Sequence, residues 1–362
     1  MLIDLIVGAR PNYPKVAAIV RAIESVPSYK DRLEYRLINT GQHHDFNMSS
    51  LFAEQLEMPP FDIELKATGN NSSQLTASII QAYSSELSKS CPSVVIVVGD
   101  VTSTLACALV AKQHGVRLVH VEAGLRSRDR TMPEELNRMV TDVLSDILYA
   151  TSEQAAINLN RADFLSENVV VVGNTMVDTL LHFRSKQRPP AFWDGTLSTN
   201  GYLLFTLHRP ANVDDTQKLL DICHDVCLEA HMPVIWPVHP RIANSILGQQ
   251  LPSNLTTVPP QGYLEFLFLL DNCLAVVTDS GGVSEEATVL SKPCLVIRNT
   301  TERIETIEAG SAELINPDSN ELKGALNKVV SNTWKSGTLP ALWDGKAAER
   351  IVKHLQSVLL NN

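Results

Sequence analysis

The stretch SVVIVVGD, residues 93–100, joins a continuous run of β-branched residues directly to a carboxylate, Asp100. A second stretch, RLVHVEAGLR at 117–126, repeats this pattern and delivers Glu122. Short apolar runs of this kind are typical of parallel strands, whose carboxyl ends line the ligand crevice. A buried carboxylate is costly unless it is paired or used, so both residues are candidates for chemistry.

The loop that follows, RDRTMPEELNR at 128–138, adds two further carboxylates, Glu134 and Glu135. The block between Gly99 and Arg138 therefore gathers acidic residues near the carboxyl ends of two predicted strands. This clustering predicts acid/base chemistry at that edge of a sheet.

Strand and helix patterns alternate along most of the chain. Strands are predicted in the first half at Leu2 to Val7, Leu33 to Asn39, Val94 to Val98, Leu118 to Val121, Ile147 to Tyr149 and Val169 to Val172, and in the second half at Tyr202 to Leu207, Val234 to Val238, Ala275 to Thr278 and Cys294 to Ile297. Helices are predicted, among others, at Lys15 to Ile23, Ser103 to His114, Leu136 to Leu144 and Leu219 to Ala230. This alternation predicts an α/β fold of βαβ units with parallel sheets.

The chain has 362 residues, which exceeds the size at which one hydrophobic core usually stops growing. Residues 182–201 contain two adjacent prolines and no hydrophobic periodicity, so they are the predicted linker. We therefore expect two Rossmann-like domains, at 1–180 and 200–345, with their parallel sheets facing across a cleft. We expect the final helix, within 346–362, to pack back on the first domain.

Composition restricts the class of protein. The net charge of −10 argues against a nucleic-acid partner or an anionic membrane surface. The N-terminus has no basic segment of a signal peptide, and no apolar run approaches eighteen residues, so we expect a cytoplasmic location. The six cysteines are scattered; Cys223 and Cys227 lie one helical turn apart and are predicted to face the core rather than to bind a metal.

Three further motifs concern anion binding and proton transfer. In the first, GARPNYPK, a predicted strand turns into a helix with Arg10 and Lys15 close to the helix N-terminus, where anions bind. An ordinary strand-to-helix turn with solvated cations is the alternative explanation for this motif.

The second motif is TDSGGVSEEA at 278–287. Adjacent glycines let a phosphate approach the backbone, Ser280 can bond a phosphate oxygen, and a glutamate in the helix can accept ribose hydroxyl hydrogen bonds. The alternative is a helix cap, with Ser280 as the capping residue and the glutamates interacting with the helix dipole. The motif alone leaves the two open.

The third motif is a pair of strand ends that each place a histidine near an arginine: His208 with Arg209, and His239 with Arg241. Together they predict a positively charged surface, or basic wall, opposite the carboxylates. The carboxylates and histidines have neither Ca²⁺-loop nor HExxH spacing, and no serine or cysteine sits in a GxSxG motif. We expect no metal and no redox cofactor.

Taken in order, these segments resemble the non-hydrolysing UDP-N-acetylglucosamine 2-epimerases, a family within the GT-B-like superfamily of two Rossmann domains. The matching segments are GARPNYPK, TGQHHD at 40–45, GDVTSTLA at 99–106, HVEAGLRS at 120–127, PEELNR at 133–138, GNTMVD at 173–178, LHRPANVD at 207–214, PVHP at 237–240, TDSGGVSEEA, and NTTERIET at 299–306. They cover nearly the whole chain.

The resemblance implies inversion at C2 of UDP-GlcNAc to give UDP-ManNAc, through elimination of UDP to a 2-acetamidoglycal and its re-addition. Catalytic positions of the family fall on Asp100, Glu122, Glu134 and His208. Positions expected to hold UDP fall on Arg10, Lys15, His239, Ser280, Gly281, Gly282 and Glu286. A homodimer is implied by the family alone.

The chain departs from the family pattern at a few positions. Pro210 replaces the second arginine of the common HRREN motif, and Ser73 precedes Gln74 where many bacterial members have an RQ pair. In members activated by a second UDP-GlcNAc these segments help hold that effector. The segments GARPN and HHDFNMS are also similar to enzymes acting on UDP-2,3-diacetamido-2,3-dideoxy-glucuronate, which is the alternative substrate.

Three other functions compete with the epimerase prediction. A hydrolysing epimerase would release free UDP one-for-one with product. A GT-B glycosyltransferase would share the UDP site but would not turn over the UDP-sugar without an acceptor. A catalytically silent UDP-sugar sensor would require loss of the acid/base residues, which are all present.

Overall fold

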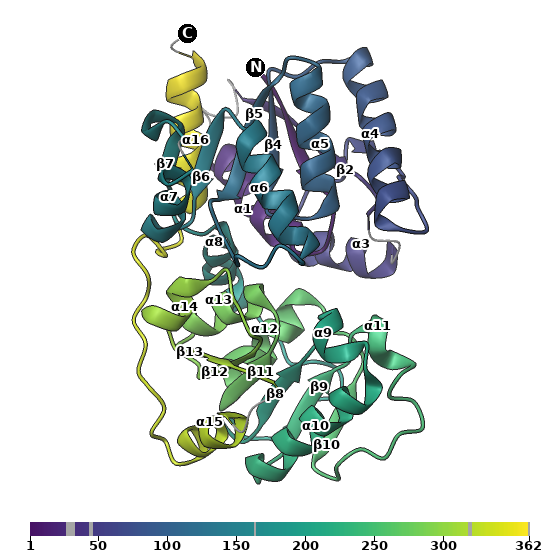
Figure 1. The fold of residues 1–362 in the computed structure, drawn as a ribbon, viewed down its shortest axis with the longest axis vertical. Helices are drawn as coiled ribbons and strands as arrows, with labels where there is room; N and C mark the ends of the chain where they lie inside the picture. Colours follow the sequence, from purple (N-terminus) through teal and green to yellow (C-terminus); the bar gives the residue numbers. More distant parts are fainter. Residues whose placement is uncertain (27–32, 43–45, 163, 318–320, 361–362) are drawn as a thin grey trace. The chain divides into compact units, whose positions relative to one another are not determined.

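The computed structural model describes residues 1–26, 33–42, 46–162, 164–317 and 321–360 (Figure 1). Residues 43–45, part of the TGQHHD segment, and the side chain of Arg241 lie outside the described part. The chain forms two compact units: Met1–His182 with Ala341–Asn362, and Phe183–Pro340. Each unit has its own parallel sheet, which confirms the predicted α/β fold class.

The first unit contains a seven-stranded sheet in the order β3-β2-β1-β4-β5-β6-β7, with parallel pairing throughout. Its strands are β1 (Leu2–Val7), β2 (Glu34–Asn39), β3 (Ile63–Glu64), β4 (Val94–Val98), β5 (Arg117–Ala123), β6 (Ile147–Ala150) and β7 (Val169–Val171). Its helices are α1 (Asn12–Ser25), α3 (Phe46–Gln55), α4 (Ser72–Lys89), α5 (Thr102–Gln113), α6 (Pro133–Leu144), α7 (Glu153–Asn160), α8 (Thr175–Phe183, crossing into the next unit) and α16 (Ala347–Leu360), with the 3₁₀ turn η1 (Ser166–Asn168).

The second unit contains a six-stranded parallel sheet in the order β10-β9-β8-β11-β12-β13. Its strands are β8 (Leu203–Thr206), β9 (Val234–Pro237), β10 (Leu255–Val258), β11 (Ala275–Thr278), β12 (Cys294–Ile297) and β13 (Ala312–Ile315). Its helices are α9 (Pro210–Val213), α10 (Thr216–Ala230), α11 (Pro240–Ala243), α12 (Tyr263–Asn272), α13 (Gly281–Val289), α14 (Ile304–Glu308) and α15 (Glu321–Val330), with the 3₁₀ turn η2 (Arg184–Lys186).

The position of the candidate site follows from these strand orders. In each sheet the order reverses at one point, between β1 and β4 in the first unit and between β8 and β11 in the second. At such a point the loops after the two neighbouring strands run in opposite directions. A crevice therefore opens between these loops at the carboxyl ends of the strands. The GARPN and GD segments follow β1 and β4, and the LHRP and TDSGG segments follow β8 and β11.

Four strands have the predicted bounds, whereas three edge strands were not predicted. All five residues of β4 are buried, and β1, β4, β11 and β12 match their predicted ranges. The sequence patterns did not predict β3, β10 or β13, which all lie at an edge of their sheet. In β10, for example, Thr256 and Thr257 are exposed, so no apolar run marks the strand.

Two other sequence predictions are decided by burial. Cys223 and Cys227 are buried in the core of the second unit, as predicted. The predicted linker begins where the first unit ends, but Trp193 within it packs edge-on against Tyr202 and Phe268 of the second unit. Among the described residues, no helix is long and apolar enough to cross a membrane.

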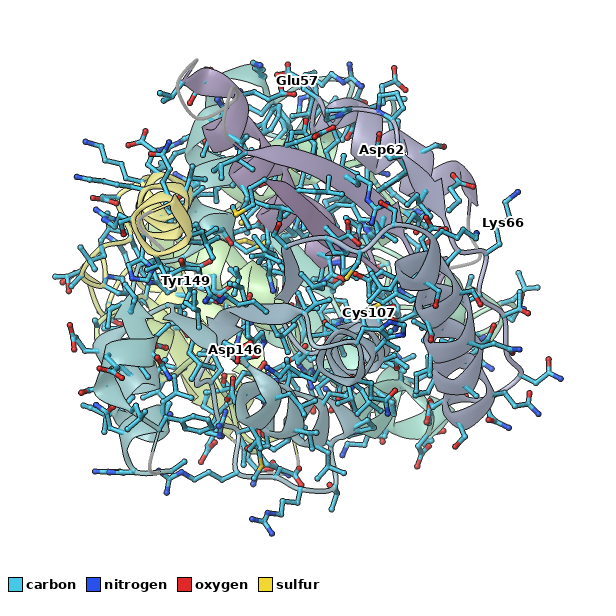
Figure 2. All side chains as sticks on the ribbon, turned by 90° about the horizontal axis from the view of Figure 1, so that it is seen from above. Glu57, Asp62, Lys66, Cys107, Asp146 and Tyr149 are labelled. Carbon is cyan, nitrogen blue, oxygen red and sulfur yellow. The ribbon has the colours of Figure 1, made fainter. Side chains whose placement is uncertain are left out.

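The C-terminal helix α16 belongs to the first unit, where it contacts α1. Tyr149, labelled in Figure 2, donates or accepts a hydrogen bond of 2.9 Å with His354 of this helix. Asp178 of α8 accepts hydrogen bonds from the backbone N–H groups of Ala347 (3.1 Å) and Ala348 (2.7 Å). It therefore satisfies two donors that the first turn of a helix leaves without partners.

Asp178→Ala is expected to lower the free energy of unfolding by about 1–2 kcal/mol, the usual cost of losing a helix cap. Urea unfolding followed by the fluorescence of the buried Trp343 measures the loss. Asp178→Asn is the matched control, because it retains an acceptor for one of the two N–H groups, and it should lose less. Equal stability of the alanine variant and the unmodified protein would show that Asp178 does not hold α16.

Candidate functional site

Asn12, in the first turn of α1, joins the two strands at which the first sheet reverses its order. Its Oδ1 accepts hydrogen bonds from the backbone N–H groups of Gly8 (3.1 Å) and Ala9 (3.0 Å) at the end of β1. Its Nδ2 donates to the carbonyl of Val98 (2.9 Å) at the end of β4. The sequence patterns did not single out Asn12, although it stands between two prolines in RPNYP, where a short polar side chain can bond nearby backbone.

Lys15, one turn further along α1, forms an ion pair with Glu122 at the end of β5. Both residues are buried, with 5% and 4% of their surfaces exposed. The resemblance assigned Lys15 to UDP and Glu122 to proton transfer. The structure brings the two together, so the ammonium group compensates the cost of burying the carboxylate.

The backbone at Glu122 is strained. Its φ is +72°, a left-handed conformation that residues other than glycine seldom adopt. The register between β5 and β6 shifts between Val121 and Ala123, so Glu122 occupies an irregularity at the strand end. Strain of this kind clusters at functional sites, because only the surrounding structure can maintain it. The strained residue is the one that pairs with Lys15.

Asp100, which follows Gly99 after β4, is held by Arg138 of α6. Arg138 donates from Nε (3.1 Å) and also from Nη2 to the same carboxylate oxygen. Asn137 donates to the backbone carbonyl of Asp100 (2.8 Å). Arg138 is buried, with 2% of its surface exposed, yet the sequence patterns gave it no role. A basic residue four positions after Glu134, on the same helix, was the available signal.

The two glutamates of the PEE segment have different surroundings. Glu135 is buried and accepts hydrogen bonds from the backbone N–H groups of Ser127 and Arg128, both 2.9 Å, and it pairs with Arg138. Its carboxylate therefore organises the loop that precedes α6. Glu134, the predicted catalytic residue of the two, is half-buried in the first turn of the helix.

Arg10 lies just before α1, and its guanidinium stacks over the ring of Phe52, 4.2 Å from the ring centroid. A stacked guanidinium is held by its flat face. Its N–H edge is the part that binds phosphate. We call the residues Lys15, Asp100, Glu122, Glu134 and Arg138 the carboxylate site of the first unit.

The strain at Glu122 can be measured with a matched pair of variants. At an ordinary position alanine is more stable than glycine by roughly 0.5–1 kcal/mol. At a left-handed position the order reverses, and Glu122→Gly is expected to be more stable than Glu122→Ala by about 1–2 kcal/mol. Chemical denaturation of both variants gives the difference. Position 123 is the control: there the protein with Ala123 should be more stable than the Ala123→Gly variant. If alanine were also the more stable residue at position 122, the backbone at Glu122 would not be strained.

In the second unit, His208 follows β8 and Asp279 follows β11. Asp279 is fully buried and accepts from the backbone N–H groups of His208 (3.1 Å) and Arg209 (2.9 Å), and from Nδ2 of Asn212 (3.1 Å). Its Oδ1 lies 2.9 Å from Nδ1 of the His208 ring. The carboxylate thus fixes both the backbone and the ring of the candidate catalytic histidine.

Two opposed effects act on the pKa of Asp279. Burial raises it, while the hydrogen bond and charge of His208, with the N–H groups of Arg209 and Asn212, lower it; the net shift is downward. Asp279 is therefore an acceptor, so Nδ1 of His208 carries a proton and Nε2 is left for proton exchange. Sequence patterns placed Asp279 in the TDSGG motif without a role.

His239, which follows β9, lies beside His208 with the two rings stacked at 28° and 5.9 Å between centroids. The structure therefore brings together the two histidines that the sequence predicted for one basic wall. The two strands that they follow, β8 and β9, are neighbours in the sheet.

The TDSGG motif forms the N-terminus of α13. Ser280 is the N-cap residue, and its Oγ accepts from the N–H of Val283 (3.4 Å). A Cβ atom added at Gly281 would lie 3.0 Å from Glu302 Oε1, so a larger residue would be crowded there. Ser280 therefore caps the helix, as the alternative interpretation of the motif predicted. The first N–H groups of α13 have no partner within the helix and point out of its N-terminus.

Buried charges surround this helix start. Glu285 pairs with Arg303 (2.6 Å), and Glu302 pairs with Arg298 (2.7 Å). Arg209 lies 3.7 Å from Glu302. Burial lowers the pKa of Arg298. The NTTER segment therefore contributes charge partners for the loop after β8, a role that its sequence alone did not indicate. We call His208, His239, Asp279, Ser280 and Gly281 the histidine site of the second unit.

No group of three or more histidines, cysteines or carboxylates suited to a metal ion is found among the described residues.

Comparisons with known proteins show the family and the fold of the chain. The family model described as UDP-N-acetylglucosamine 2-epimerase matches residues 28–356. The chain belongs to this epimerase family. The UDP-N-acetylglucosamine 2-epimerase of Methanocaldococcus jannaschii is 36% identical over 370 residues, which cover 98% of this chain and 99% of that protein.

Two further relatives bear on substrate and fold. The UDP-2,3-diacetamido-2,3-dideoxy-D-glucuronate 2-epimerase of Pseudomonas aeruginosa is 35% identical over 367 residues, covering 98% of this chain and 99% of that enzyme. The crystal structure of the Methanocaldococcus jannaschii enzyme in complex with UDP-GlcNAc and UDP has a TM-score of 0.88 and 34% identity, covering 99% of this chain and 100% of that one. The GT-B-like fold predicted by resemblance is thereby confirmed.

For this epimerase, Asp279→Asn is expected to lower kcat about 10²–10⁴-fold, because an amide can offer its N–H₂ to Nδ1 and select the wrong tautomer of His208. Steady-state kinetics with the UDP-sugar measure the loss. Asp271→Asn, which changes a carboxylate paired with the exposed Arg184, is the control and should retain kcat. An unchanged kcat in Asp279→Asn would show that this carboxylate does not orient His208.

Proposed function

We propose that the protein interconverts UDP-GlcNAc and UDP-ManNAc by a non-hydrolysing mechanism. The observation that carries the proposal is the carboxylate site, in which Asp100 and Glu122 are each held by a cation from a different helix. Such carboxylates are positioned as ionised acceptors, as abstraction of a proton requires. The family of the chain and the fold of the Methanocaldococcus jannaschii enzyme support the same reaction.

In this scheme the C2 proton of the sugar passes to a base, and the C1–O bond to UDP breaks, leaving a 2-acetamidoglycal. Return of a proton on the other face and re-addition of UDP complete the inversion. We propose four acid/base residues: Asp100, Glu122, Glu134 and His208. One positioned base contributes only about 10²–10⁴-fold, so much of the rate must come from stabilising UDP as it leaves.

The groups proposed to stabilise UDP are cations and backbone N–H groups. Arg10 lies near the N-terminus of α1, and Ser280, Gly281 and Gly282 form the N-terminus of α13. Helix N-termini bind phosphate through free N–H groups and the helix dipole. His239 is proposed to add to this group, and the buried Glu286 to accept hydrogen bonds from the ribose. Lys15 is proposed to act on both Glu122 and a phosphate.

The alternative substrate is UDP-2,3-diacetamido-2,3-dideoxy-glucuronate. The observation in its favour is the Pseudomonas aeruginosa relative, whose identity of 35% nearly equals that of the UDP-GlcNAc epimerase at 36%. Both substrates invert at C2 by the same elimination. The carboxylate site therefore supports the reaction with either sugar, and we prefer UDP-GlcNAc because the family model is described by that activity.

Incubation with UDP-GlcNAc alone in D₂O, followed by proton NMR, tests the reaction. We expect UDP-ManNAc with deuterium at C2 and no accumulation of free UDP. Retention of the original hydrogen at C2 would refute elimination, and free UDP equal to product would show a hydrolysing enzyme. Turnover of the diacetamido-glucuronate nucleotide but not of UDP-GlcNAc would identify the alternative substrate.

We also propose that the enzyme works as a homodimer in the cytoplasm. All six cysteines are free thiols, which fits a reducing compartment. Helix α6 buries charged side chains and exposes apolar ones, the opposite of an ordinary surface helix. Glu135, Arg138 and Asp142 are buried, whereas Leu136, Val140 and Val143 are exposed. Each chain has a net charge of −10, so an uncharged apolar face is where two copies meet with least repulsion.

Val143→Asp is expected to convert the dimer into monomers, because it places two like charges at a self-complementary face. Light scattering after gel filtration gives the mass. Leu228→Asp is the matched control, since Leu228 is 68% exposed, close to the 71% of Val143, but lies on α10. A monomeric unmodified protein, or a dimer that survives Val143→Asp, would exclude this interface.

A further inference from the structure

His120, in the middle of β5, is fully buried and contacts two elements that carry candidate catalytic residues. Its Nδ1 lies 2.7 Å from Oδ1 of Asp142 on α6, and its Nε2 lies 2.8 Å from the carbonyl oxygen of Gly99. Gly99 immediately precedes Asp100. A single side chain therefore bridges the turn after β4 and the helix that carries Glu134 and Arg138.

Both partners of the imidazole are acceptors. A backbone carbonyl can only accept, so Nε2 must donate to Gly99. Asp142 faces donors on its other side as well: its Oδ2 lies 2.6 Å from Nη2 of Arg126 and accepts from the N–H of Gly124 (3.3 Å). A carboxylate opposite a guanidinium is ionised, so Nδ1 of His120 must also donate. Both ring nitrogens then carry hydrogen.

We propose that His120 is a buried imidazolium that positions the carboxylate site, holding the Gly99–Asp100 turn against α6. This role rests on the proposed epimerase function. The imidazolium does not touch the substrate; it fixes where Asp100, Glu134 and Arg138 stand relative to one another. A doubly donating ring is required, because a neutral ring leaves one of its two acceptors without a hydrogen bond.

The turn that His120 holds carries one of its candidate catalytic residues, Asp100, directly after a glycine in a left-handed conformation. Gly99 has a φ of +68°, and a Cβ atom added there would lie 3.3 Å from Nζ of Lys15 and 3.7 Å from Nδ2 of Asn12. The Gly99 residue therefore lies beside Lys15 of the Lys15–Glu122 pair and immediately before Asp100 of the Asp100–Arg138 pair. A charge-assisted hydrogen bond at this junction is stronger than a neutral one and sets its position more sharply.

The charges that face His120 come from each element packed against it. Asp142 of α6 is the negative partner, Arg126 after β5 lies on the far side of Asp142, and Lys15 of α1 is beyond Gly99. Asp142 thus lies between the His120 ring and the Arg126 guanidinium, and an ionised carboxylate balances both positive charges. The arrangement differs from that of His208, which has one carboxylate partner and a partly exposed ring.

Nitrogen-15 NMR of protein labelled at histidine tests the protonation directly, without any substrate. We expect both ring nitrogens of His120 to show an attached hydrogen at neutral pH. The exposed His224 and His231 in the same spectrum are internal controls and should exchange their ring hydrogens rapidly with water. A ring nitrogen of His120 without hydrogen would overturn the proposal, whatever the fate of the epimerase assignment.

His120→Gln tests the positioning role, because its amide can donate to Gly99 or Asp142 but not in the geometry of the ring. We expect kcat and the rate of C2 deuterium exchange to fall about 10²-fold, with KM nearly unchanged, as for a misplacement of about 1 Å. Leu118→Val, on the same strand but in the core facing α5, controls for lost stability and should keep kcat. Wild-type kcat in His120→Gln would overturn the positioning role.

If neither variant nor unmodified protein turned over a UDP-sugar, the epimerase function would fail, while the NMR result would still decide the state of His120. The two failures are therefore distinguishable.

Discussion

Burial of charge at the carboxyl ends of the strands is the constraint on which the rest of the structure depends. Lys15 and Glu122 show it most clearly: each would be prohibitively costly in the interior alone, and together they tie the first turn of α1 to the end of β5. Asp100 is paired in the same way with Arg138 of α6. Glu122 and Asp100 are thus each held by a cation from a helix, Lys15 of α1 and Arg138 of α6, so helix packing determines where these two carboxylates stand.

The second unit meets the same constraint mainly with N–H donors in place of a lysine or arginine side chain. There Asp279 is the buried charge, and it collects the N–H groups of the loop that carries His208 and Arg209. The buried Glu302 and Glu285 neutralise Arg298 and Arg303 near the start of α13. In both units the strand order reverses at the point where these charges gather, which is where a parallel sheet offers its crevice.

Buried strands and the residues directly after them could be predicted from the sequence, because hydrophobic periodicity marks both. Buried strands such as β4 are continuous apolar runs, and the residues after them, Asp100 and Glu122, were identified from that pattern alone. The assignment to a family of nucleotide-sugar epimerases came from motifs that matched in order along the chain. Exposed strands such as β10 escaped because they carry no apolar run.

The partners of the site could not be predicted, for a physical reason. Arg138, Asp279, Asn12 and His120 act through contacts that join distant parts of the chain, 38 residues apart for Arg138 and Asp100 and 71 for Asp279 and His208. No local pattern records such a pairing. The left-handed backbone of Glu122 is likewise imposed by tertiary structure, since glutamate has no preference for it.

The ion pair of Lys15 and Glu122 is the buried link that holds the carboxylate site. A double-mutant cycle of unfolding free energies tests it most directly. Lys15→Met should cost about 3–5 kcal/mol, because it leaves Glu122 buried without a cation, and the double variant Lys15→Met/Glu122→Leu should recover much of that loss. A loss below about 1 kcal/mol for Lys15→Met, comparable to that of an exposed pair, would show that this ion pair does not hold the carboxylate site.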